Sequence, residues 1–96
     1  MKTYSWWSKS ERDDGEARWE ATCGSFYLLI DAMPGGGFTA GVTFSVNRDV
    51  RFEVGSGTFG SLAKAKEFIG SMILPELERM TAFTKALVVH NPPWVD

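Results

Sequence analysis

The stretch that decides the fold is Phe38-Thr39-Ala40-Gly41-Val42-Thr43-Phe44-Ser45-Val46, followed after a short turn by Val50-Arg51-Phe52-Glu53-Val54. In both segments apolar residues alternate with small, polar or charged ones, which is the period of a half-buried β-strand. The residues between them, 47–49, are turn formers. The pattern predicts two half-buried strands, with their Phe and Val side chains facing the core.

A helix is predicted after the glycine-rich connection 55–60. Ser61 is a candidate N-cap, because its hydroxyl can accept a hydrogen bond from an amide of the first turn. Apolar residues then recur at helical spacing, with the nearby charged side chains mostly away from them. This stripe consists of Leu62, Ala65, Ile69, Met72 and Ile73. Pro75 either kinks this helix or begins a second one, and 86–89 fit either a short last strand or a helix end.

Three further segments are predicted upstream. Residues 2–8 and 16–22 alternate around Asp14-Gly15, a strong turn signal, so they are expected to form a hairpin in which Trp6 and Trp19 can pair. The apolar run 26–32 suits a central strand, and it can continue 16–22 through a bulge at Gly24-Ser25. We therefore expect one α+β domain over 1–96, with an antiparallel sheet of about four strands packed against one long or Pro-kinked C-terminal helix.

Composition narrows the function classes. The net charge is −2 and the pI is about 5.3, which argues against general nucleic-acid binding because phosphates need a cationic surface. Cys23 is the only cysteine, so an internal disulfide is excluded and a reducing compartment is favoured. The N-terminal residues have no signal-peptide pattern, and no apolar run is long enough to cross a membrane. We expect a cytoplasmic protein without a membrane partner.

Residues that could carry chemistry are few and scattered. His90 is the only histidine, and Cys23 has no neighbouring histidine to activate it. The glycine stretches 35–37 and 55–57 do not match a phosphate-binding motif. We therefore expect no catalytic residue, metal site or cofactor, and interpret the chain as a non-enzymatic protein.

The strongest signal for a partner-binding surface comes from tryptophans near the chain ends. Exposed tryptophan is enriched among interface hot spots, although these rings can instead cap the open end of the sheet. Charged residues at the predicted hairpin tip are candidates for the rim of the same contact surface. The predicted partner-binding residues are Trp6, Trp7, Trp94, Arg12, Asp13, Asp14 and Glu16.

The order of three strands, a glycine loop and the helix start Ser61-Leu62-Ala63-Lys64-Ala65-Lys66 resembles the second half of a double-stranded-RNA-binding domain. This resemblance implies RNA contacts through Lys64 and Lys66, to which Arg48 and Arg51 can be added. The expected affinity would then fall steeply with salt.

In size and layout the whole chain also resembles small phage and prophage accessory proteins, including anti-CRISPR inhibitors. That resemblance implies a protein that occludes the surface of a host protein, and it assigns no particular residue. The leading hypothesis is therefore a protein-binding domain, with a mobile-element inhibitor as its specific form. The alternatives are a nucleic-acid-binding domain, a small homodimer that pairs its edge strands, and a small enzyme that uses His90 or Cys23 with a carboxylate.

Overall fold

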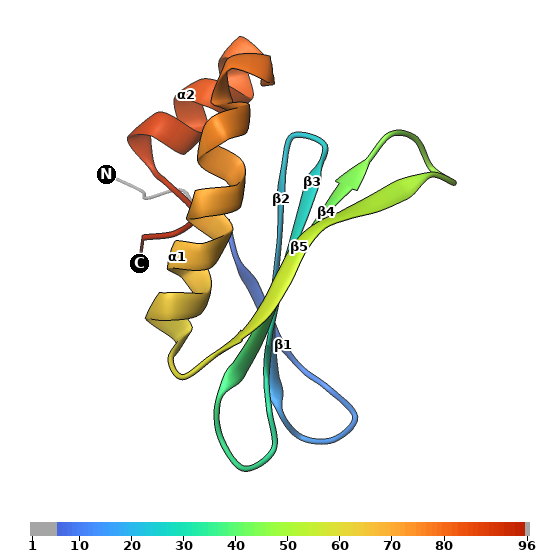
Figure 1. The fold of residues 1–96 in the computed structure, drawn as a ribbon, viewed down its shortest axis with the longest axis vertical. Helices are drawn as coiled ribbons and strands as arrows, with labels where there is room; N and C mark the ends of the chain where they lie inside the picture. The colour runs from blue at the N-terminus through green and yellow to red at the C-terminus, as the bar shows by residue number, and fades with distance from the viewer. Residues whose placement is uncertain (1–5, 96) are drawn as a thin grey trace.

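A computed structural model describes residues 6–95 of the chain, and it is an α+β fold with two layers (Figure 1). Five antiparallel strands form a meander in the order β1-β2-β3-β4-β5, and the helices lie on one side of this sheet. The elements are β1 (Ser8–Glu11), β2 (Ala17–Cys23), β3 (Phe26–Ala32), β4 (Phe38–Ser45), β5 (Arg51–Phe59), α1 (Leu62–Ile73), η1 (Leu74–Arg79) and α2 (Ala82–His90). The predicted fold class is confirmed, with five strands where about four were expected.

The first hairpin turns where the sequence predicted, because Gly15 has φ of +85°, a conformation that glycine adopts without steric cost. Its first strand is Ser8–Glu11, which shares only Ser8 with the predicted strand 2–8 and otherwise lies in the polar stretch expected to turn. Lys9, not Trp6, lies opposite Trp19, and its ammonium group is 5.4 Å from the centre of the Trp19 ring. The predicted Trp6–Trp19 pair is therefore wrong. Residues 2–5 of the predicted strand lie outside the described residues.

The additional strand arises at Gly24-Ser25. These residues do not form a bulge in one long strand; they form the two-residue turn between β2 and β3, with Cys23 opposite Phe26. Gly24 has φ of +61°, which fits the first central position of a type II′ hairpin turn. Residues 17–32 therefore supply two strands, and β3 becomes the central strand of the sheet.

The last strand is longer than predicted because it includes glycines that looked like a loop. Phe38 of β4 lies opposite Phe59 of β5, so the ladder runs through Gly55 and Gly57. A β-carbon on Gly55 would lie 3.0 Å from the sulfur of Met72, and one on Gly57 would lie 2.9 Å from the Phe59 ring. Both glycines leave room for side chains packed over the sheet, which is a common reason for glycine within a strand.

The helical layer begins as predicted and ends differently. The Ser61 hydroxyl accepts a hydrogen bond from the backbone N–H of Lys64 at 3.2 Å, which confirms the N-cap. Pro75 lies near the start of η1, where the helix tightens after Ile73, and thus marks the end of α1. Thr81 then caps α2, so residues 86–89 are helical and the strand alternative is wrong.

The core lies between α1 and the middle of the sheet. Ile69 and Ile73 of the helix and Leu28, Ile30 and Val42 of the sheet are fully buried. Each such side chain contributes about 1.5–3 kcal/mol relative to an exposed position. The predicted helix stripe is thus confirmed.

Lys66 departs from the expected pattern, since it is only 7 % exposed. Its ammonium group lies 6.0 Å from the centre of the Trp7 ring. A lysine can bury its aliphatic stem against apolar groups in this way.

Candidate functional site

An apolar cleft separates the outer half of the β4–β5 hairpin from the end of the helical layer. Figure 1 shows the hairpin running away from the helices, beyond the point where α1 covers the sheet. The register between β4 and β5 shifts between Val42 and Thr43, and such an irregularity bends a strand. The resulting cavity has a volume of about 440 Å³.

The floor of this cleft is aromatic and its far wall is helical. Phe26 and Phe44 meet edge to face on the sheet, with ring centres 5.2 Å apart. Val54 of β5 and Met80, which follows η1, add apolar surface. The remaining lining residues are Gly24, Ser25, Glu76, Arg79, Thr81 and Thr84. We call this space and its lining residues the hairpin cleft.

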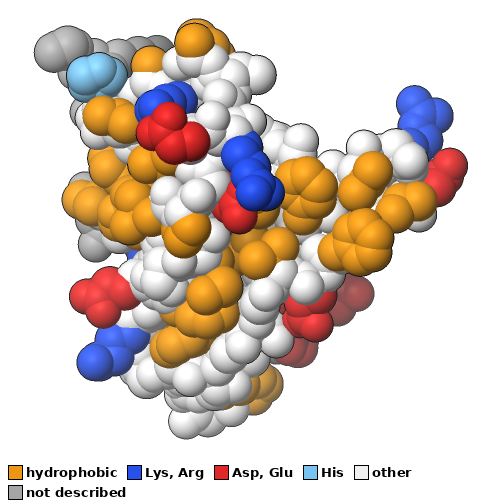
Figure 2. All heavy atoms as spheres, turned by 45° about the horizontal axis from the view of Figure 1, so that its top comes forward, with side chains coloured by type: hydrophobic (Ala, Val, Ile, Leu, Met, Phe, Trp, Pro, Cys, Tyr) orange, Lys and Arg blue, Asp and Glu red, His pale blue; other side chains and the backbone are white. Residues whose placement is uncertain are grey.

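Large apolar side chains stand exposed on the outer hairpin, and of these Val54 lines the cleft. Phe52 is 59 % exposed and Val46 is 56 % exposed, and Val50 and Val54 are also exposed. Figure 2 shows hydrophobic side chains gathered along the protruding hairpin and on the neighbouring helical surface. The sequence placed Val46, Phe52 and Val54 in the core, and this prediction is wrong because the helical layer does not extend over the outer hairpin.

The tryptophans near the chain ends occupy a different region, where N-terminal and C-terminal residues meet. The indole N–H of Trp6 donates to the carbonyl of Asn91, and that of Trp7 donates to the carbonyl of Pro93 at 2.6 Å. Trp94 covers Gly70 of α1, where an added β-carbon would lie 2.9 Å from the ring. All three rings are half-buried, and we call this region the tryptophan corner.

Partner contact through Trp6, Trp7 and Trp94 stays a prediction. Their positions agree with the alternative interpretation, in which these rings cap the open end of the sheet. Each ring already packs against the core or hydrogen-bonds across the chain ends. These rings therefore have a structural role whether or not a partner also touches them.

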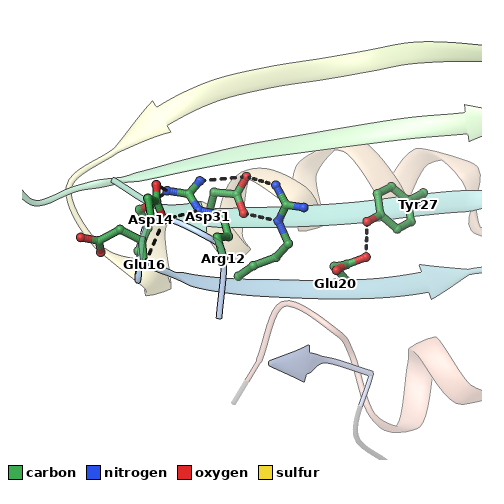
Figure 3. Close-up of polar contacts among 8 residues, drawn as sticks. Arg12, Asp14, Glu16, Glu20, Tyr27 and Asp31 are labelled. Carbon is green, nitrogen blue, oxygen red and sulfur yellow. Dashed lines mark hydrogen bonds and ion pairs between the residues drawn. The ribbon is translucent and has the colours of Figure 1, made fainter. Parts of the chain in front are cut away.

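The charged residues of the first hairpin form an ion-pair network around Asp31 (Figure 3). Arg18 donates to both carboxylate oxygens of Asp31, at 2.7 and 3.0 Å, and Arg12 lies 3.4 Å from the same group. Arg12 also pairs with Asp14 at 2.6 Å and donates to the carbonyl of Ala32. The predicted rim residue Arg12 thus belongs to a network that joins the β1–β2 turn to β3.

This network holds the pKa of Asp31 below its ordinary value, chiefly through the hydrogen bond from Arg18. The pKa of Asp14 is also lowered, first of all by the backbone N–H of Glu16, which donates to its carboxylate. Asp13 is exposed and Glu16 is half-buried in the same turn. Their contact with a partner is a prediction that the fold leaves untested.

Tyr27 and Cys23 lie outside the hairpin cleft and differ in exposure. The Tyr27 hydroxyl donates to the Glu20 carboxylate on the sheet face opposite the helices (Figure 3), and desolvation followed by this hydrogen bond raises the pKa of Tyr27 to about 12. Burial raises the pKa of the Cys23 thiol to about 11. The fully buried Cys23 side chain is therefore protonated and shielded from reagents at neutral pH.

His90 ends α2 and is exposed, and neither His90 nor Cys23 lines the hairpin cleft. Over residues 6–95, no group of three or more His, Cys, Asp or Glu side chains is arranged to hold a metal ion. Within the same range, none of the helices has the length and apolar character needed to cross a bilayer.

The four cations proposed for RNA contact do not form one surface. Arg48 and Arg51 lie at the outer end of the β4–β5 hairpin, whereas Lys64 lies in the first turn of α1, at the opposite end of the molecule (Figure 1). Lys66 is buried beside Trp7. The described arrangement therefore lacks the continuous cationic stripe that follows a phosphate backbone.

Comparison with protein-family models, with curated proteins and with solved structures gave no match. Sequence reasoning did not find the hairpin cleft, although one signal was present. The apolar alternation extends to Val46 and Val54, farther than a twelve-residue helix can cover.

Proposed function

We propose that this chain is a non-enzymatic protein-binding domain whose binding surface is the hairpin cleft. The observation that carries the proposal is the exposure of Phe52, Val46 and Val54 beside a cavity with an aromatic floor. Exposed apolar clusters are costly in water and commonly mark contact sites. A partner that fills the cleft would remove these side chains from water.

The chemistry of the cleft favours an apolar protein segment as its ligand. Glu76 and Arg79 face each other across 3.7 Å, so the charges on the helical wall balance. Thr81 and Thr84 supply hydroxyl groups near the edge. A surface of this kind offers shape and apolar area to a protein side chain and gives no cationic path for a phosphate chain.

Inhibition by occlusion is the specific form of this proposal. A domain that seats one apolar segment of a partner can cover roughly 800 Å² of it, which is an ordinary interface. The protruding hairpin extends the contact surface beyond the body of the fold (Figure 2). The proposed mobile-element inhibitor would bind a host protein in this way and block the surface that it covers.

The test compares variants that remove apolar surface inside and outside the cleft. Met80→Ser changes a lining residue, and Phe52→Ser changes the exposed ring paired with the lining residue Phe44, whereas Val89→Ser changes an exposed valine of α2 that does not line the cleft. Each tagged variant is incubated with a lysate of the source organism, and retained proteins are identified by mass spectrometry. An apolar fluorescent dye provides a second readout, and circular dichroism checks folding.

We expect the wild type and Val89→Ser to retain the same partner protein. The amount retained by Phe52→Ser and by Met80→Ser should be at least tenfold lower. The dye should brighten with the wild type and with Val89→Ser, and clearly less with the other two. Equal retention and equal dye binding in all four proteins would contradict the proposal.

A further inference from the structure

The two edges of the sheet differ in how well they are protected from pairing with another strand. β1 has only four residues, among them Lys9 and Glu11. β5 has nine residues and contains no proline or lysine. Short, charged edges resist pairing, whereas long edges with apolar side chains are templates for it. The β5 edge is therefore the one open to an added strand.

The outer part of this edge is self-complementary. Residues 50–54 read Val-Arg-Phe-Glu-Val, which has the same pattern of apolar and charged positions in either direction, with opposite charges at the two mirror positions. If a second copy runs antiparallel with Phe52 opposite its own equivalent, Arg51 lies opposite the partner's Glu53. The same symmetry places Val50, which directly precedes β5, opposite the partner's Val54, the residue at the register shift.

The side chains of this segment are available for such a contact. Phe52 is 59 % exposed, Val50 is 40 % exposed and Val54 is 41 % exposed. Within the described residues, neither Arg51 nor Glu53 takes part in an ion pair. Figure 1 shows the outer hairpin running away from the helices.

We infer that two copies of this chain pair antiparallel through the outer half of β5, about a two-fold axis at Phe52. The Phe52 rings meet across the axis, and two Arg51–Glu53 pairs flank them, an arrangement in which cross-strand pairs stabilise a sheet. The two five-stranded sheets become one continuous sheet with both helical layers on the same side. Two hairpin clefts then open beside one shared aromatic seam.

Charge variants test this pairing without touching the cleft. Arg51 and Glu53 lie opposite Ser45 and Thr43, whereas Phe52 lies opposite the cleft residue Phe44, so the charges face the other side of the sheet. The variants are Arg51→Glu, Glu53→Arg and the double exchange. Sedimentation equilibrium over a concentration series at low salt measures the mass, which is 10.7 kDa for one chain.

The wild type and the double exchange should approach twice the single-chain mass as concentration rises. Each single variant should dimerise about tenfold more weakly, because two attractive pairs become repulsive. An equimolar mixture of the two single variants should form a heterodimer, since its four charges are again complementary. This rescue cannot come from a misfolded variant.

A wild type that stays monomeric at millimolar concentration would overturn the inference. Equal dimerisation affinity in the wild type and all charge variants would also overturn the inference, because the contact would then lie elsewhere. Dye binding at the cleft distinguishes a failure of the dimer from a failure of the proposed function. The charge variants should still bind the dye, whereas Phe52→Ser should lose both the dye signal and the dimer.

Discussion

The tryptophan corner and the outer β4–β5 hairpin both carry large aromatic rings, and the chain uses them in opposite ways. At the corner, Trp6, Trp7 and Trp94 are half-buried against the helical layer and the C-terminal residues. On the hairpin, Phe52 points into solvent from a strand that continues past the helices. An aromatic ring stabilises the fold only where other residues of the chain pack against it. Where the ring is exposed to water, its surface can contact another molecule.

The largest effect should come from exchanging a ring in each region for alanine. Trp7→Ala removes a packed ring and an indole hydrogen bond, so the free energy of unfolding should fall by roughly 2–3 kcal/mol, below the range for fully buried rings. Phe52→Ala should change it by less than about 0.5 kcal/mol. Urea denaturation of both variants measures the difference.

Phe83→Ala is the matched control for an exposed ring on the helical side, since Phe83 is 75 % exposed. It should behave like Phe52→Ala in the same urea series. Equal losses for Trp7→Ala and Phe52→Ala would refute the contrast between the two regions.

Gly70 gives a sharper test of the packing at the corner. Alanine is a better helix former than glycine by about 1 kcal/mol, so the change should stabilise an open helix. Here the added methyl group meets the Trp94 ring at 2.9 Å, and overpacking of this kind costs about 1–3 kcal/mol. Gly70→Ala should therefore lower the thermal midpoint, as followed by circular dichroism.

The control is the same substitution in a Trp94→Ala background. With the ring removed, Gly70→Ala should be neutral or stabilising, so the double-mutant cycle should show strong coupling. Additive effects of the two changes would show that Trp94 does not sit over Gly70.

A smaller effect is expected at the Asp31 network, which lies apart from both aromatic regions. Asp31→Asn keeps the shape and removes the charge that two arginines share; because the Arg18 side chain is partly exposed, stability at pH 7 should fall by only about 1 kcal/mol. Because the pKa of Asp31 is lowered in the folded state, its contribution is present above the ordinary value of 3.8 and is lost as the pH falls below it.

Denaturation between pH 7 and pH 2 checks the sign of this contribution. The wild type and Asp31→Asn should converge in acid, since protonation then removes the same charge from the wild type. A difference that stays constant over the whole range would assign the loss to packing and not to the ion pairs.

Sequence reasoning predicted the inner part of the fold well because its signals are local. Ser61 and the helical stripe that follows it fix the start and the buried face of α1. It failed for the outer hairpin because alternation shows that one strand face is apolar, and says nothing about whether a helix reaches far enough to cover it. Val46 and Phe52 follow the pattern of Val42 and are nevertheless exposed.

The remaining differences have similar causes. Glycines 55 and 57 look like a loop in sequence, and only the side chains packed above them show why a strand needs them there. The predicted partner site rested on tryptophans whose hydrogen-bond acceptors lie more than eighty residues away in the chain. No local pattern can reveal contacts of that separation.

The bonds from Trp6 and Trp7 to the C-terminal residues also set an order for assembly. Each strand of the meander pairs with the one just synthesised, so the sheet can form progressively, hairpin by hairpin. The indole N–H groups join residues separated by 85 and 86 positions, so they gain their acceptors only after Pro93 has left the ribosome. The tryptophan corner can therefore form only after every strand of the meander has been synthesised.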